Sequence, residues 1–357
     1  MFKSKYIRLI GSSVILTLSL AACSSATKNN NQSPAQNKTE NNSAQKTVSY
    51  LYTANESGSV SKIDLSTNKV VETIKDEGEP HNVQISPDGK VVACTSPVKM
   101  EKGQTEHGSM SMNGSVVFYD AESGKLIKRV EVGKHPAHVV FTQDGKYVLV
   151  TNNEDNNVSI IDANNYKLIT NVGVGKGPHG FRIASDSKYA YVANMGEDTV
   201  SVVDIENQKE VRKIKVGSTP VTTGITKDGK TLVVTVNSEN ALAIVDLTSD
   251  KVQKVAVGVG PAQVYIESDD KYAFVANQGT EDKPSNSVTK IDLTTRQAAA
   301  EIQTGKGAHG VVVSPDNKYV YVTNMYEATV SVIDNSTNKV IATIPVDKEP
   351  NGITFKR

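Results

Sequence analysis

An internal repeat of roughly 42 residues runs through residues 48–357, and it is the sequence feature that limits the fold most strongly. Each of its seven copies contains an alternating apolar run that ends in YVTN or a variant, as in KYVLVTN (146–152) and KYVYVTN (318–324). A second alternating run closes on Asp, a polar turn leads to a third, and a fourth begins at a Gly/Pro-rich loop. Because period-two alternation is typical of β-strands, each copy is expected to form four antiparallel strands.

The number and length of the copies predict a closed ring of sheets. Four-stranded units of about 40 residues, repeated four to eight times, are typical of β-propellers. The chain begins its first copy at a second strand, from residue 48, and it ends on a first strand at 350–357. We therefore predict an all-β, seven-bladed β-propeller of four-stranded antiparallel blades, in which the N- and C-terminal strands share one blade and close the ring.

Seven aspartates, one in each copy, close the second alternating runs. Asp at the end of a strand favours a turn, because its carboxylate accepts hydrogen bonds from backbone N–H groups two or three residues further on. We expect these residues to have a folding role: Asp64, Asp120, Asp162, Asp204, Asp246, Asp292 and Asp334.

The segment that reads YVTN at Tyr321–Asn324 resembles the YVTN-type β-propeller repeat proteins, and the resemblance covers residues 48–357. WD-type repeats do not fit, because the chain contains no Trp. The resemblance implies the fold but leaves function open. Similar propellers include lactone hydrolases, a lyase of cyclic depsipeptide antibiotics, surface-layer and adhesive modules, and the propeller domains of nitrous oxide reductase and cytochrome d1 enzymes.

The N-terminus has the layout of a secretory signal. A basic start, MFKSKYIR, precedes the apolar run LIGSSVILTLSLAA, which is too short to span a bilayer comfortably. The sequence LAAC at 20–23 resembles the bacterial lipobox, which implies acylation of Cys23; the alternative is an ordinary cleavage site with an incidental Cys. We predict a signal peptide (1–22), a lipidated Cys with a flexible polar tether (23–47) and a propeller (48–357), held at the cell membrane and facing outside the cytoplasm.

The charge balance excludes some partners. The chain has 39 basic and 39 acidic residues, and its first 22 residues carry three basic residues and no acid. The remaining chain is therefore mildly acidic, which argues against binding to nucleic acid. A domain of this size buries enough apolar surface to fold as a monomer. Besides the membrane, we expect a protein, cell-envelope or small-molecule ligand.

Four histidines are the main candidate site residues. They lie in the Gly/Pro-rich loops before the innermost strands of the blades. These loops should share one face of the ring with the loops that follow the YVTN strands. His81, His179 and His309 have the phase of residues that face a neighbouring blade, whereas His138 has the opposite phase. One interpretation is that they hydrogen-bond to loop backbones between blades; the other is that they converge on a metal or an anionic ligand at the channel mouth.

Methionines gather on the same predicted face. The larger insertion, residues 96–114, contains Met100, His107, Met110 and Met112 and resembles methionine-rich copper-binding segments. Thioethers select soft ions such as Cu(I), although exposed methionines also form adaptable protein-binding surfaces. Matching loops elsewhere carry Met195 and Glu197, and Met325 and Glu327, which we include in the candidate ligand-binding face.

These observations favour a membrane-anchored binding or interaction module that uses its loop-rich face. An alternative is a metal-handling protein or metalloenzyme, with copper as the favoured ion. A further alternative is a lactonase-like hydrolase or lyase, in which His81, His179 or His309 would act as general acid or base. The sequence contains no Ser-centred elbow, HExxH motif or Walker-type loop, so nothing in it requires catalysis.

Overall fold

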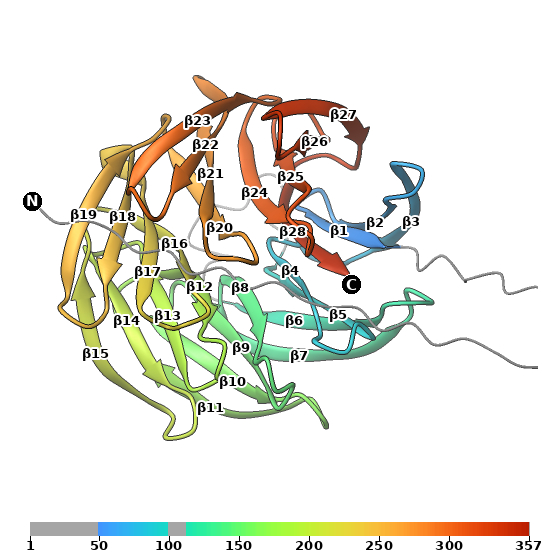
Figure 1. The fold of residues 1–357 in the computed structure, drawn as a ribbon. Helices are drawn as coiled ribbons and strands as arrows, with labels where there is room; N and C mark the ends of the chain where they lie inside the picture. Colours follow the sequence, from blue (N-terminus) through green and yellow to red (C-terminus); the bar gives the residue numbers. More distant parts are fainter. Residues whose placement is uncertain (1–48, 99–111, 357) are drawn as a thin grey trace, which may run out of the picture. The chain divides into compact units, whose positions relative to one another are not determined.

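The computed structural model describes residues 49–98 and 112–356 and shows a ring of seven four-stranded antiparallel sheets (Figure 1). This confirms the predicted seven-bladed β-propeller. From the inner strand to the outer, blade A contains β28 (Pro350–Lys356), β1 (Tyr50–Asn55), β2 (Ser59–Asp64) and β3 (Lys69–Lys75), and blade B contains β4 (Val83–Ile85), β5 (Val91–Ser96), β6 (Asn113–Asp120) and β7 (Leu126–Lys134). In the same order, blade C contains β8 (Pro136–Phe141), β9 (Tyr147–Asn152), β10 (Asn157–Asp162) and β11 (Lys167–Gly173); blade D contains β12 (Pro178–Ile183), β13 (Tyr189–Asn194), β14 (Thr199–Asp204) and β15 (Lys209–Lys215); and blade E contains β16 (Pro220–Ile225), β17 (Thr231–Val236), the short 3-10 helix η1 (Asn237–Glu239), β18 (Ala241–Asp246) and β19 (Lys251–Ala256). Blade F contains β20 (Pro261–Ile266), β21 (Tyr272–Gly279), β22 (Pro284–Asp292) and β23 (Gln297–Gln303), and blade G contains β24 (Ala308–Val313), β25 (Tyr319–Asn324), β26 (Thr329–Asp334) and β27 (Lys339–Pro345).

Blade A is assembled from both ends of the described chain, as predicted. The last strand, β28, pairs antiparallel with β1, and Leu51 lies opposite Phe355 (Figure 1). Ile353 of β28 is 5% exposed and belongs to an apolar cluster that also contains residues of blade G. The ring is thus closed by backbone pairing and by side-chain packing together.

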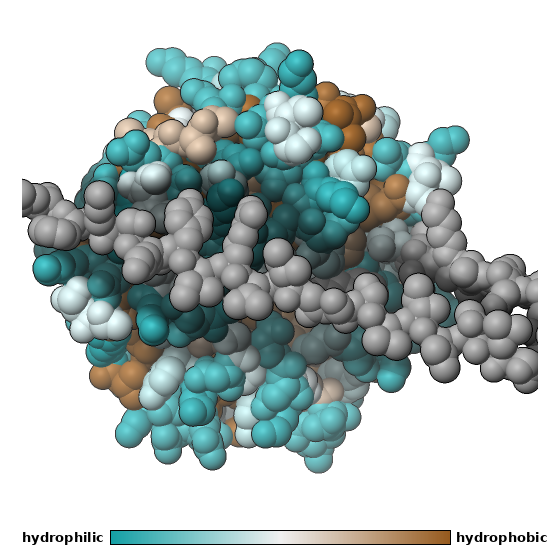
Figure 2. Space-filling view, viewed as in Figure 1, coloured by the Kyte–Doolittle hydropathy of each residue, from teal (hydrophilic) through white to brown (hydrophobic). Residues whose placement is uncertain are grey.

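The core lies between neighbouring blades. Alternating apolar residues of one sheet pack against those of the next; the fully buried Phe181 of blade D, for example, joins a cluster that includes Leu149 of blade C. The outer strands turn one face to solvent and expose isolated apolar residues such as Val71 and Ile341. Figure 2 agrees, since its surface is mostly hydrophilic with scattered hydrophobic patches.

The threonine of the YVTN motif links four of the seven blades to the next one among the described residues. Thr323 accepts a hydrogen bond from Gly310 N (2.7 Å) in its own blade and donates one to Asn351 O (2.9 Å) in the next. Asn324 donates to Thr329 and Ser331 of the following strand, at 2.9 Å each. The threonine therefore joins inner strands across blades, and the asparagine joins the second and third strands within a blade. The same threonine bridge recurs at Thr95, Thr151 and Thr235.

The seven strand-ending aspartates form turns, as expected. In each blade one carboxylate oxygen accepts the backbone N–H two or three residues further on, as from Ser66 N to Asp64 (2.7 Å) and from Asn207 N to Asp204 (2.9 Å). These bonds support the connections between the third and fourth strands of the blades.

The structure describes the shorter of the two insertions but only the ends of the larger one. The shorter one lengthens β21 and β22, which pair as far as Gly279 and Pro284. The larger insertion falls mainly in residues 99–111, outside the described residues, together with Met100, His107 and Met110. The leader, Cys23 and the tether also lie outside them. Among the residues that the structure does describe, no helix is long and apolar enough to cross a membrane.

Deleting residues 350–357 should destabilise the whole propeller, because it removes an innermost strand and exposes the inner edge of β1. We expect the melting temperature, followed by circular dichroism, to fall by on the order of 10 °C or more. A control that lacks only residues 356–357 keeps Ile353 and should melt within about 2 °C of the wild type. An unchanged melting temperature after the longer deletion would contradict closure through blade A.

Candidate metal centre at the channel mouth

The inner strands carry an irregularity that aims two consecutive residues at the channel mouth. In six blades the pairing of the first and second strands shifts by one residue, as between Pro178 and Phe181 of β12, so the inner strand contains a bulge. A bulge redirects side chains at this point. The residues involved, with their equivalents in blade B, are His81–Asn82, Ala137–His138, His179–Gly180, Val221–Thr222, Ala262–Gln263, His309–Gly310 and Asn351–Gly352.

The bulge brings the four predicted histidines together. The ring centroids of His138 and His179 are 5.0 Å apart, and that of His81 lies 5.3 Å from His179, 6.0 Å from His138 and 6.4 Å from His309. The phase argument that separated His138 from the other three is therefore wrong, because strict alternation does not hold at a bulge. The hydrogen bond between His179 Nδ1 and Val221 O of blade E agrees with the interblade interpretation for His179.

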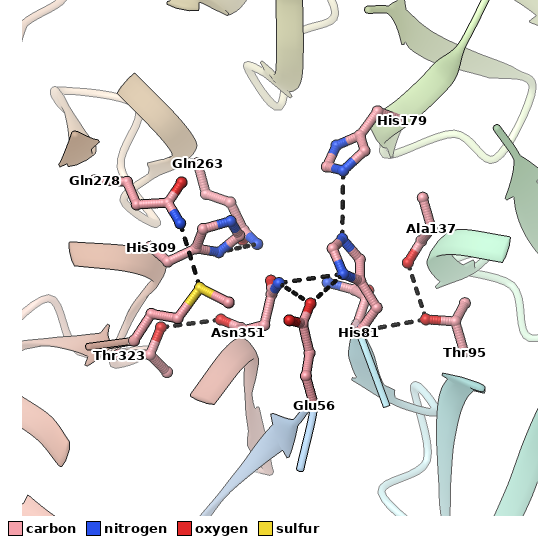
Figure 3. Close-up of polar contacts among 12 residues, drawn as sticks. Glu56, His81, Thr95, Ala137, His179, Gln263, Gln278, His309, Thr323 and Asn351 are labelled. Atoms are coloured by element: carbon pink, nitrogen blue, oxygen red, sulfur yellow. Dashed lines mark hydrogen bonds and ion pairs between the residues drawn. The ribbon is translucent and has the colours of Figure 1, made fainter. Parts of the chain in front are cut away.

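Glu56 holds one edge of His81. Its Oε1 lies 2.6 Å from His81 Nδ1, and Asn351 Nδ2 donates to the same oxygen at 2.7 Å (Figure 3). Although burial opposes ionisation, the hydrogen bond and the charge of His81 with that of His309 lower the pKa of Glu56 to about 2. Glu56 is thus a carboxylate at neutral pH, and it requires a proton on His81 Nδ1.

His179 is oriented in the same way by a backbone carbonyl. Its Nδ1 lies 3.2 Å from Val221 O in blade E, so this nitrogen carries the proton. Gly180 allows the approach, because a Cβ at this position would lie 2.7 Å from the same carbonyl oxygen. The Nε2 atoms of His81 and His179 then face each other at 3.3 Å (Figure 3). With both Nδ1 atoms protonated, the facing Nε2 atoms can be stabilised by a proton on one of them or by a metal ion between them.

His138 and His309 complete the group from buried positions. His138 is fully buried, and neither of its ring nitrogens has a hydrogen-bond partner among the described residues. A buried polar group without a partner costs about 1–3 kcal/mol, so these nitrogens are a signal for a ligand. His309 is 5% exposed, and its Nδ1 lies 3.5 Å from Gln263 Nε2.

Burial keeps these imidazoles neutral. Desolvation is the largest cause of the lowered pKa of His138, of His309 and of the partly buried His179, and the neighbouring histidines add to it. The pKa falls to about 3 for His179 and to about 4 for His309, and it lies well below its ordinary value for His138. Neutral imidazole is the form that binds metal ions.

The histidines of blades B, C and D meet the geometry of a metal site. One potential ligand atom from each of His81, His138 and His179 lies within 4.8 Å of the other two. With about 2.05 Å from nitrogen to metal, two ligands of a tetrahedral site are separated by roughly 3.4 Å, which matches the 3.3 Å between the Nε2 atoms of His81 and His179. His309 lies beside this set.

The predicted methionines and acids have other surroundings. Met112 is 50% exposed and Met195 is 38% exposed, whereas Met325 is partly buried and accepts a hydrogen bond from Gln278 Nε2 at 3.2 Å. The carboxylate of Glu197 is held by Thr199, by Lys176 N and by Lys213. Glu327 lies close to Gly305, at the edge of blade G.

A cavity of about 500 Å³ lies away from the histidines. It is lined by residues of the turns at the opposite ends of the strands, including Asp269, Lys318 and Asp334. Lys290 at this cavity donates to Asn335 O at 3.1 Å and to Asn335 Oδ1 at 2.7 Å, so it links blades F and G. We regard this region as structural.

The buried histidines should make the metal-free protein less stable as the pH falls. Between about pH 6.5 and the lowered pKa values, the unfolded chain binds protons that the folded rings do not, so the free energy of unfolding falls below pH 6.5. Each ring contributes a slope of up to about 1.4 kcal/mol per pH unit. Urea unfolding in EDTA from pH 6.5 to 4.5 should show a shallower slope for His309→Gln than for the wild type.

His135→Gln is the matched control for this experiment, because the His135 side chain is 48% exposed and should change the slope less. Glu56 interferes little, since its contribution is lost mainly between its ordinary pKa of 4.5 and about 2, below the pH range of the experiment. Identical slopes for the wild type and His309→Gln would show that His309 is not held neutral.

Comparisons with solved structures agree with the propeller fold. Hydrazine synthase of Kuenenia stuttgartiensis is 22% identical, with a TM-score of 0.67 over 77% of this chain and 89% of that chain. A functionally unknown protein from Desulfotomaculum acetoxidans DSM 771 is 14% identical, with a TM-score of 0.71 over 86% and 98%. The dihydro-heme d1 dehydrogenase NirN in complex with DHE is 15% identical, with a TM-score of 0.60 over 86% and 74%. Identities this low show the fold alone.

Residues 232–354 match the cytochrome D1 heme domain family. Of the four clustered histidines only His309 falls in this match, and it is buried against its neighbours. The ring centroids are 5.0–6.4 Å apart, so a tetrapyrrole does not fit between the imidazoles, whereas a single ion does.

No curated protein matches the chain. A second family model, the choice-of-anchor I domain, matches residues 40–256, which is more than half of the sequence. This chain therefore belongs to the choice-of-anchor I domain family.

Proposed function

We propose that this protein is a cell-surface binding module whose ligand at the channel mouth is a transition-metal ion held by His81, His138 and His179. The observation that carries the proposal is the pair of Nε2 atoms that face each other at 3.3 Å while both Nδ1 atoms are fixed by acceptors. In metal sites, a carboxylate or carbonyl on the far nitrogen of each histidine typically fixes the tautomer and increases the basicity of the ligand. Glu56 and Val221 O would have these roles.

The site has an asymmetric access to solvent that suits reversible binding. His138 is fully buried, whereas the side chain of His81 is 15% exposed and that of Glu56 is 25% exposed. An ion would enter from the side of His81 and His179, and His138 would bind it from beneath. Three imidazoles leave a fourth position, for which His309, water or an external ligand would compete.

Imidazole ligands suit copper, zinc, nickel and iron, so the histidines alone do not select the ion. Copper remains the favoured choice because the insertion at 96–114 supplies Met100, His107, Met110 and Met112 on the same predicted face. In this proposal the insertion would deliver or retain copper near the histidines.

The described part of the propeller begins at the face opposite the histidines. Strand β1 runs from Tyr50, which pairs with Asp64 and Lys356, towards Asn55 and Glu56 at the channel mouth. In this proposal the residues that precede the propeller serve as its tether. The name of the choice-of-anchor family agrees with a chain of this kind.

Metal binding is tested by titrating the EDTA-treated full-length chain with Cu(II) and Zn(II) in a calorimeter. The wild type should bind one ion per chain, His179→Ala should bind at least tenfold more weakly, and Glu56→Gln should lose about 10- to 100-fold in affinity. His135→Ala, outside the cluster, should match the wild type. Equal affinities for the wild type and His179→Ala would refute the site, and stoichiometric hemin binding that requires His309 would replace it with a heme site.

Lipid anchoring is tested by cell fractionation. In a bacterial host with a lipoprotein pathway, the wild type should be recovered with the membranes, and Cys23→Ser should be lost from that fraction, because serine lacks the thiol that carries the lipid. Cys94→Ala is the control; Cys94 is buried in blade B and should leave the distribution unchanged. Membrane recovery of Cys23→Ser equal to that of the wild type would exclude anchoring through this residue.

A further inference from the structure

A single arginine reaches across the channel beneath the histidines. Arg182 lies on β12, three residues after His179, which places it roughly 10 Å deeper at about 3.3 Å per residue. Its guanidinium carbon lies 6.0 Å from the centre of the Tyr265 ring on β20. Blade E separates these two strands, so the side chain must cross the channel to reach that ring. Gly224, the equivalent residue on β16, has no side chain to obstruct it.

The Arg182 guanidinium has few hydrogen-bond partners among the described residues. Its one hydrogen bond to the described residues runs from Nη1 to Phe181 O at 3.0 Å, and no carboxylate of those residues lies within ion-pair distance. Guanidinium has five N–H donors, so most of them are left for another partner. The Tyr265 hydroxyl likewise has no hydrogen-bond partner in the described part of the chain. The carboxylate at the channel mouth, Glu56, is already bonded to His81 and Asn351.

Two other arginines of this protein, in contrast, have carboxylate partners. Arg212 forms a two-contact pair with Asp250 at 2.8 and 2.9 Å, and Arg129 contacts the buried carboxylate of Asp76 at 3.3 Å. Desolvation lowers the pKa of Arg182, and its charge contributes to the lowered pKa of His138. Because the side chain is only partly exposed, the cation loses part of its hydration, and a bound anion would offset that loss.

We propose that Arg182 makes the channel beneath the histidines a binding site for a small oxyanion, either a carboxylate or an inorganic anion. Both classes present two oxygens with the spacing of the guanidinium fork, which allows paired charge-assisted hydrogen bonds. In this proposal the Tyr265 hydroxyl would donate a further one. This site does not require the metal proposed above, and each can exist without the other.

The test measures anion binding by the EDTA-treated full-length chain, so that metal plays no part. Acetate and formate probe carboxylates, whereas nitrate and inorganic phosphate probe inorganic anions, all at constant ionic strength with chloride as the reference salt. Calorimetry should show about one site per chain for at least one class. Arg182→Met should weaken binding at least tenfold, Arg182→Lys and Tyr265→Phe should weaken it less, and Arg212→Met should match the wild type.

Arg182→Met is expected to fold, because it keeps the length of the side chain and removes an uncompensated charge. Its melting temperature in chloride should equal or exceed that of the wild type, and added anion should raise the melting temperature of the wild type alone. The proposal is overturned if none of the four anions binds the wild type more tightly than Arg182→Met. His179→Ala should retain anion binding, which separates failure of this site from failure of the metal site.

Discussion

Closure of the ring is the constraint on which the rest of the structure depends. Each sheet has two apolar faces and can bury both only if it has a neighbour on either side. Blade A provides the last neighbour by pairing β28 with β1, and Ile353 then packs with residues of blade G. Because closure fixes every inner strand around one axis, side chains from four different blades reach each other at the mouth, although more than 200 residues separate His81 from His309.

Much of this architecture follows from the repeat. Strand positions, blade number, ring closure and turn-forming aspartates such as Asp204 are readable from the alternation and from the motif spacing. The convergence of the histidines cannot be predicted from the alternation. Periodicity places His138 and His179 on opposite sides of their strands, and only the bulge brings them together. Strand β4 is also shorter than expected, since it begins at Val83 and not at Pro80.

The partners of the histidines were harder to predict than the histidines themselves. Glu56 is one acid among many in the loops, and Asn351 is one of several polar residues on the inner strands, so nothing local marks either as a partner of His81. Arg182 is different. Aligning the seven inner strands shows it as the only charged side chain at its position, where the other copies have Gln84, Val140, Gly224, Tyr265, Val312 and Thr354. A departure of this kind within an otherwise regular repeat is a signal of function.

The electrostatics of the channel connect the two proposed sites. Neutral imidazoles with unsatisfied nitrogens and an arginine without a carboxylate both oppose folding, and neither is needed to close the ring. A metal ion at His138 would add positive charge above Arg182, and an anion at Arg182 would add negative charge below the metal. Since opposite charges attract more strongly in a channel of low dielectric, each ligand would raise the affinity for the other by the same factor. The anion class that Arg182 selects would then be the class of external ligand that the metal meets.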